Sequence, residues 1–120
     1  MKRNVYTLII SIFFLLLSCK KAGETVSGTY NGTVTINASP SGNGTTVITK
    51  VSDNTVNMSF VIGAASPTFF TNVAVTGSEN PYSLSYSDAG GNLYGQVDGN
   101  QLIFTIFDTS STQTTFTGSK

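Results

Sequence analysis

The feature that most constrains this chain is the alternation of apolar and polar residues in short runs after residue 27. In residues 55–62, for example, Val56, Met58, Phe60 and Ile62 alternate with polar residues. Successive side chains of a strand point to opposite faces, so a period of two predicts strands with one buried face. Turn-forming residues interrupt these runs at a spacing of roughly ten residues, which is typical of an all-β domain.

The spacing predicts eight strands, joined by turns rich in Gly, Ser, Asn and Asp such as "SPSGNG" at 39–44 and "DGN" at 98–100. Consecutive antiparallel strands with short connections favour an up-and-down meander, and closing it into a small barrel removes its exposed edges. The alternative is a β-sandwich, although the Cys pair and Trp of immunoglobulin domains are missing. The expected strands are residues 29–37, 45–51, 55–62, 68–76, 82–87, 93–97, 101–107 and 112–118.

Residues 1–18 have the order of an export signal. Lys2 and Arg3 precede an apolar stretch at 5–17, and a small residue, Ser18, follows. The apolar stretch is too short to cross roughly 30 Å of hydrocarbon as a permanent helix. We therefore predict that residues 1–18 are a cleaved signal peptide.

The residues Leu16, Leu17, Ser18 and Cys19 resemble a bacterial lipobox. The resemblance implies that Cys19 becomes the first mature residue and carries a diacylglycerol, since only a thiol forms the thioether. Cys19 is the single cysteine of the chain and has no disulfide partner within it. Each buried acyl methylene contributes about 0.8 kcal/mol, so two or three chains would anchor the protein stably. Residues 19–27 are then expected to be the lipidated cysteine and a polar tether.

Two further resemblances concern the source and the domain. The Phe-rich segment followed by Ser, Cys, Lys, Lys looks most like lipoproteins of the Bacteroidetes group. The runs "VSGTYNGTVTI" at 26–36 and "TFTGSK" at 115–120 resemble the small calycin-like (lipocalin-like) domains of such lipoproteins. Lipocalins begin with Gly, any residue, Trp, whereas here Tyr30 follows Gly28 and Thr29. The resemblance implies a barrel domain at 28–119 and a place in the cell envelope, in the outer membrane, with the periplasmic or surface face left open.

Composition argues against several classes of function. Without Lys2 and Arg3, four lysines face six acidic residues, and a weakly acidic domain is a poor binder of nucleic acid. The chain has no His, so its hydroxyls lack the usual activating base. The acidic residues of the domain fall in or beside predicted turns, where carboxylates bond local backbone. Asp98, Gly99 and Asn100 look like a calcium-loop fragment, but a late Glu is missing. We expect no enzyme, no cofactor and no metal.

Period-two alternation also predicts which side chains face the barrel interior. An interior of eight strands is either just filled or holds one small ligand, and both alternatives stay open. The inward set includes Val47 and Val51 and the candidate ligand-lining residues Tyr30, Met58, Phe60, Phe69, Tyr82, Tyr86 and Phe104. Phe70, Ile103 and Phe107 should then point outward as a surface for a partner, unless a bulge has shifted the register.

These observations favour a lipid-anchored, non-enzymatic binding or interaction module of the bacterial cell envelope. One alternative is a carrier that holds a small apolar ligand inside the barrel. Another is adhesion or assembly through the outward aromatic surface. The expected partners are the membrane, through the lipid, and a small apolar ligand or an envelope protein.

Overall fold

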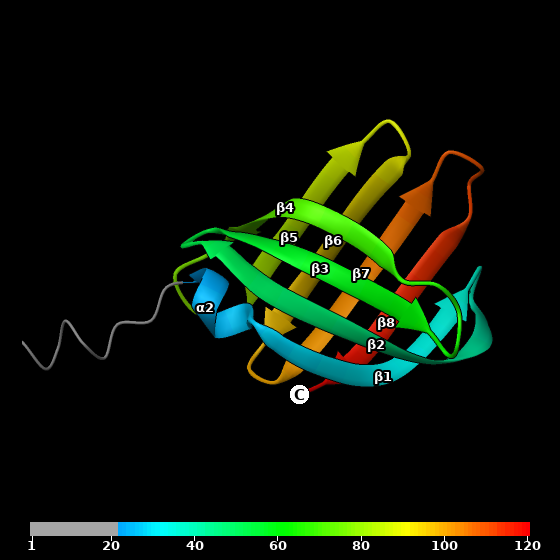
Figure 1. Cartoon of the computed structure of the whole chain (residues 1–120), viewed down its shortest axis with the longest axis horizontal. Coiled ribbons are helices and arrows are strands. Elements are labelled where there is room, and N and C mark those ends of the chain that lie inside the picture. Colours follow the sequence, from blue (N-terminus) through cyan, green and yellow to red (C-terminus); the bar gives the residue numbers. More distant parts are fainter. Residues whose placement is uncertain (1–21) are drawn as a thin grey trace, which may run out of the picture.

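The computed structural model describes residues 22–120, and these form a closed antiparallel barrel with one short helix (Figure 1). The strands follow one another around the barrel in chain order, and β1 pairs with β8 to close it. The predicted meander barrel is therefore confirmed, and the sandwich alternative is wrong. The elements are α2 (Ala22–Val26), β1 (Gly28–Ile36), β2 (Ser39–Ser52), β3 (Thr55–Ile62), β4 (Thr68–Thr76), β5 (Tyr82–Asp88), β6 (Gly91–Asp98), β7 (Gln101–Asp108) and β8 (Gln113–Ser119).

The first turn lies earlier than the sequence predicts. Residues 39–44 were expected to form a turn, but they pair with β1 as the first half of β2. The chain reverses instead at Asn37 and Ala38, whose φ angles of 50° and 65° are both positive. Two consecutive left-handed residues match the twist of a tight hairpin, and Asn tolerates this conformation better than most residues. The Gly-rich composition of 39–44 therefore did not mark the turn.

The register of β2 is opposite to the prediction. Val47 and Val51 were expected inside, yet both side chains are exposed, and Thr46 and Ile48 point into the barrel. The run from Thr45 to Val51 has apolar residues on both faces, so alternation alone did not decide between them.

The register of β4 changes within the strand. Thr71 and Asn72 together oppose the single residue Asn57 of β3, which is a bulge, and Asn72 has a φ of 58°. The Asn72 N–H donates to Oδ1 of Asn57 at 3.1 Å. Because of the extra residue, Phe70 points inward with Val73, and the predicted orientations of Phe69 and Phe70 are both wrong.

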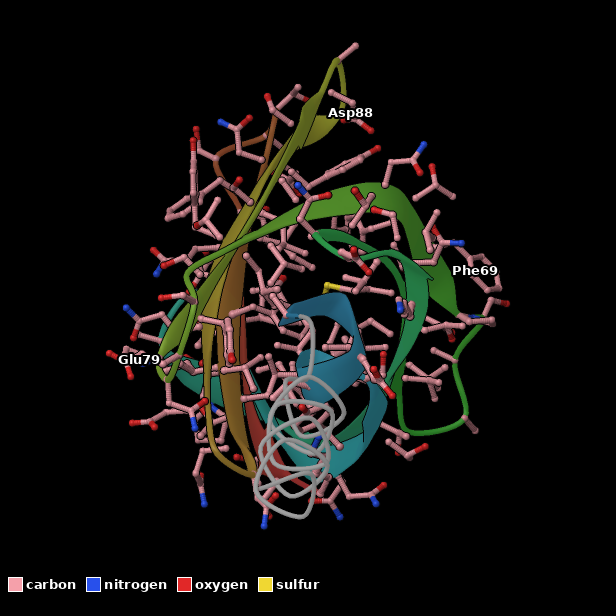
Figure 2. The ribbon with its side chains drawn as sticks, turned by 90° about the vertical axis from the view of Figure 1, so that its left-hand side faces the viewer. Phe69, Glu79 and Asp88 are labelled. Carbon is pink, nitrogen blue, oxygen red and sulfur yellow. The ribbon has the colours of Figure 1, made fainter. Side chains whose placement is uncertain are left out.

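One end of the barrel is covered by α2 (Figure 2). Val26 is fully buried against the core, and the Gly23 N–H donates to the Asp53 carbonyl in the β2–β3 turn at 2.7 Å. A Cβ on Gly23 would lie 2.3 Å from the Ser52 carbonyl oxygen, so glycine permits this close approach. The expectation of a polar tether is therefore wrong for residues 22–26, which belong to the folded domain. Cys19 lies outside the described residues.

Residues 22–120 contain one helix, α2, of five residues, and no helix in this range is long and apolar enough to cross a membrane.

Candidate functional site

The middle of the barrel is filled by aromatic side chains. The rings of Phe60, Phe104 and Phe116 contact one another, with centroids 5.3 to 5.7 Å apart. Gly118 leaves room for this cluster, because a Cβ there would lie 2.6 Å from Cζ of Phe116. A ligand at the level of these rings would have to displace them.

Most of the candidate lining residues do face the interior. Five are buried in the core, Tyr86 is half-buried at one end, and Phe69 lies on the outer surface with 68% of its area exposed. Figure 2 shows Phe69 directed away from the barrel. The buried five are Tyr30, Met58, Phe60, Tyr82 and Phe104. Their role in holding a ligand stays a prediction.

The end of the barrel opposite α2 opens into a depression of about 380 Å³. It is formed where the β3–β4, β5–β6 and β7–β8 turns meet, and we call it the mouth. Phe60 lies at its base, and Ile62, Phe70, Tyr86 and Ile106 line its apolar walls. Phe70 and Tyr86, on the neighbouring strands β4 and β5, touch edge to face in the wall of the mouth, with ring centroids 5.4 Å apart. The mouth is thus an apolar recess open to solvent.

The rim of the mouth carries two carboxylates that are held by local hydrogen bonds. Asp88 accepts the Tyr86 hydroxyl at 2.6 Å and the Gly90 N–H at 2.7 Å. The hydrogen bond from Tyr86 and then that from Gly90 lower the pKa of Asp88, while the hydrogen bond to Asp88 raises the pKa of Tyr86. Asp108 accepts the N–H groups of Ser110 and Thr112, each at 2.9 Å. The prediction that these carboxylates serve turns is confirmed.

The end of the barrel covered by α2 is closed by main-chain and lysine contacts. The Tyr30 hydroxyl donates to the Val26 carbonyl at 2.8 Å, and burial raises the pKa of Tyr30 to about 12. Lys120 Nζ donates to the carbonyls of Thr25 and Ser27 at 3.0 and 2.9 Å and lies 5.4 Å from the Tyr30 ring centroid. The sequence did not reveal this cap, since five residues are too few to show helical periodicity.

Inside the barrel wall, Thr46 is fully buried, and its Oγ1 has no hydrogen-bond partner. It stands opposite Tyr30 on one side and Phe60 on the other. A buried unsatisfied hydroxyl costs about 1 to 3 kcal/mol. Nothing in the surrounding apolar core explains its presence.

The outer face of β6 and β7 carries exposed apolar side chains. Ile103 and Phe107 point outward, as the sequence predicts. Tyr94, which was not among the predicted surface residues, lies between them on the neighbouring strand. Phe70 is not part of this surface, because the bulge in β4 turns it inward. The surface is therefore defined by Tyr94, Ile103 and Phe107, and we call it the outer patch.

No protein-family model, no curated protein and no solved structure matches this chain. Within residues 22–120, no group of three or more His, Cys, Asp or Glu side chains could hold a metal ion. The fold and the site together define a closed eight-stranded meander barrel with one capped end and one open, apolar end.

Proposed function

We propose that this chain is a lipid-anchored, non-enzymatic binding module of the bacterial cell envelope. It is attached to the outer membrane through Cys19 and takes a small apolar ligand at the mouth. The observation that carries the proposal is the contrast between the two ends: α2 closes one, and the other opens into an apolar recess. The resemblance of residues 26–36 and 115–120 to calycin-like domains of Bacteroidetes lipoproteins supports it.

The mouth has the chemistry of a small-molecule site. Its volume of about 380 Å³ falls in the usual range for ligand pockets, and its walls are mostly apolar. Asn92 and Thr114 add polar groups at the edge that would orient a ligand. Because Phe60, Phe104 and Phe116 occupy the level below, the proposed ligand sits at the mouth and not deep inside the barrel.

A mutation in the lipobox tests the anchor. Cys19→Ala removes the only thiol and should release the protein from the membrane fraction of cells that express the full chain. Mass spectrometry of the wild-type protein should show the added lipid. A Cys19→Ala protein that stays in the membrane fraction like wild type would contradict lipid anchoring.

A matched pair of variants on β7 tests the mouth. Ile106→Asp places a charge in the apolar recess, while Ile103→Asp places the same charge on the exposed outer face of the same strand. In a thermal-shift screen with fatty acids and small aromatic metabolites, a bound compound should lose at least tenfold in affinity with Ile106→Asp and little with Ile103→Asp. If no compound shifts the wild-type melting temperature, or both variants respond alike, the mouth is not the ligand site.

The outer patch supports a second candidate function, adhesion or assembly. Tyr94, Ile103 and Phe107 place three large apolar side chains on one exposed surface. Replacing all three with Ser should leave folding intact and abolish any self-association measured by sedimentation. Association that is unchanged in this variant would exclude the patch.

A further inference from the structure

The barrel wall is incomplete along one line, the seam between β4 and β5. These strands pair through only three residue pairs, Ala74–Ser85, Val75–Leu84 and Thr76–Ser83, near the end capped by α2. Beyond Ala74 and Ser85 they diverge, so that residues 68–73 of β4 and 86–88 of β5 have no strand beside them on this side (Figure 1). On its other side, β5 stays paired with β6 as far as Asp88.

The direction of the main-chain groups at the seam follows from the hydrogen-bond pattern. The Val75 N–H donates to Asn54 on the β3 side at 2.9 Å, so the neighbouring Ala74 and Thr76 direct their groups toward β5. Their partners Ser85 and Ser83 therefore face β4, and by the same alternation so does Ser87. The N–H and C=O of Ser87 point into the seam, where no strand of residues 22–120 pairs with them. They form an open strand edge.

A groove of about 520 Å³ lies along this edge. It is lined by hydroxyl, amide and phenol side chains from both strands and from β6, namely Thr71, Asn72, Ser85, Tyr86, Ser87 and Tyr94. The Tyr86 ring, which lines the groove, also meets the Phe70 ring of the mouth with centroids 5.4 Å apart, and the Tyr94 ring of the groove is 55% exposed. The groove thus offers the open main-chain N–H and C=O of Ser87, an apolar contact at the Tyr86 ring and an aromatic contact toward solvent.

We propose that the seam binds an extended peptide segment of a partner protein as an added strand beside β5. The strand would run beside residues 86–88, roughly 10 Å, and would have an apolar side chain at every second position, next to Phe70 and Tyr86. An isolated segment fits better than a second copy of this barrel. A copy could pair here only by bringing its own β4–β5 seam against this one, since its other strands already have neighbours on both sides, whereas an isolated segment is free of that restriction. This inference rests on the proposed role as a binding module and names a partner class for it.

The test uses the mature chain in detergent and a displayed library of random octapeptides. Ser87→Pro removes the one N–H that faces the seam and leaves the β5–β6 pairing intact, as proline allows on an edge strand. Ser87→Ala is the matched control, since it removes only the hydroxyl, which bonds Asn92 at 2.6 Å. A selected peptide should lose at least tenfold in affinity for Ser87→Pro and less than threefold for Ser87→Ala.

Two further measurements do not depend on the variants. Methylating alternate peptide nitrogens of the selected sequence should abolish binding in one register and spare it in the other, because only one set of amides faces β5. The Ser87 amide should exchange quickly in the free chain and at least tenfold more slowly with peptide, while the Tyr86 amide, bonded toward β6, is slow in both.

Several results would overturn the proposal. One is a library that yields no peptide beyond those enriched on Ser87→Pro. Another is protection that spares Ser87 and maps instead to Ile106 of the mouth, or to Ile103 and Phe107 of the outer patch, none of which lines the groove. Slow exchange of Ser87 that appears with rising protein concentration alone would assign the seam to a second copy. Loss of lipid anchoring or of ligand binding at the mouth would refute the proposed function and leave these peptide measurements unaffected.

Discussion

Phe69 and Phe70 are neighbours in β4 whose side chains lie on opposite sides of the barrel wall. Phe69 is 68% exposed and Phe70 is 9% exposed, packed edge to face against Tyr86. The bulge at Thr71 and Asn72 decides which of the two points inward. The extra residue exchanges the inward and outward faces for the residues of β4 that precede it, so Phe70 lies on the same face as Val73 and Val75.

This assignment gives a prediction for a matched pair of variants. Phe70→Ala should lower the free energy of unfolding by about 3 kcal/mol, because it leaves a cavity at the barrel wall, whereas Phe69→Ala should change it by less than about 0.5 kcal/mol. Urea denaturation followed by far-ultraviolet circular dichroism measures both. Equal effects, or a larger effect for Phe69, would show that the strand does not have the bulged register.

At the scale of elements, α2 is a cap and not a spacer. Val26 is fully buried, and its carbonyl accepts a hydrogen bond from the Tyr30 hydroxyl. The carbonyl of Ser27, just beyond the helix, accepts one from Lys120. A helix of five residues is too short to be stable alone, so its stability comes from this packing.

The cap can be tested with two neighbouring residues. Val26→Ala removes two buried methyl groups and should lower the free energy of unfolding by about 1.5 kcal/mol. Glu24→Ala alters an exposed side chain of the same helix and should stay within about 0.5 kcal/mol of wild type. Denaturant titration distinguishes the cap from a tether, because a tether would make both variants neutral.

At the scale of the whole molecule, the cap and the proposed anchor fix an orientation. Cys19 precedes Ala22 by three residues, which span at most roughly 10 Å of extended chain. With α2 docked on one end, a lipid on Cys19 would hold that end near the bilayer. The mouth would then face away from the membrane and receive its ligand from the aqueous side.

Fluorescent labels at the two ends check this orientation. A label on residue 100, in the β6–β7 turn at the capped end, should be quenched strongly by headgroup-bound quenchers in liposomes carrying the lipidated protein. A label on residue 110, in the β7–β8 turn at the mouth, should be quenched weakly. Stronger quenching at residue 110 would mean that the mouth faces the bilayer.

The sequence indicated which apolar residues the candidate site contains, but not always on which face of the barrel wall their side chains lie. Phe60, Phe104 and Met58 were predicted inside and are buried there, since their strands alternate cleanly. The β2 residues Val47 and Val51 were assigned to the wrong face, because that strand offers apolar side chains on both sides. No pattern in the sequence predicted a role for Tyr94, which belongs to the outer patch and also lines the groove at the seam.

The sequence by itself determined the all-β class and the order of eight short strands, and it favoured a closed meander, because period-two alternation and short turns are local properties of the chain. Whether the interior is filled was decided by the tertiary structure, in which the rings of Phe60, Phe104 and Phe116 meet. Only the tertiary structure decided the bulge in β4, the cap formed by α2, the position of the mouth and the incomplete pairing of β4 with β5. Each of these depends on which distant segments meet, such as Gly23 with Asp53 or Asn57 with Asn72, and no local pattern encodes such contacts.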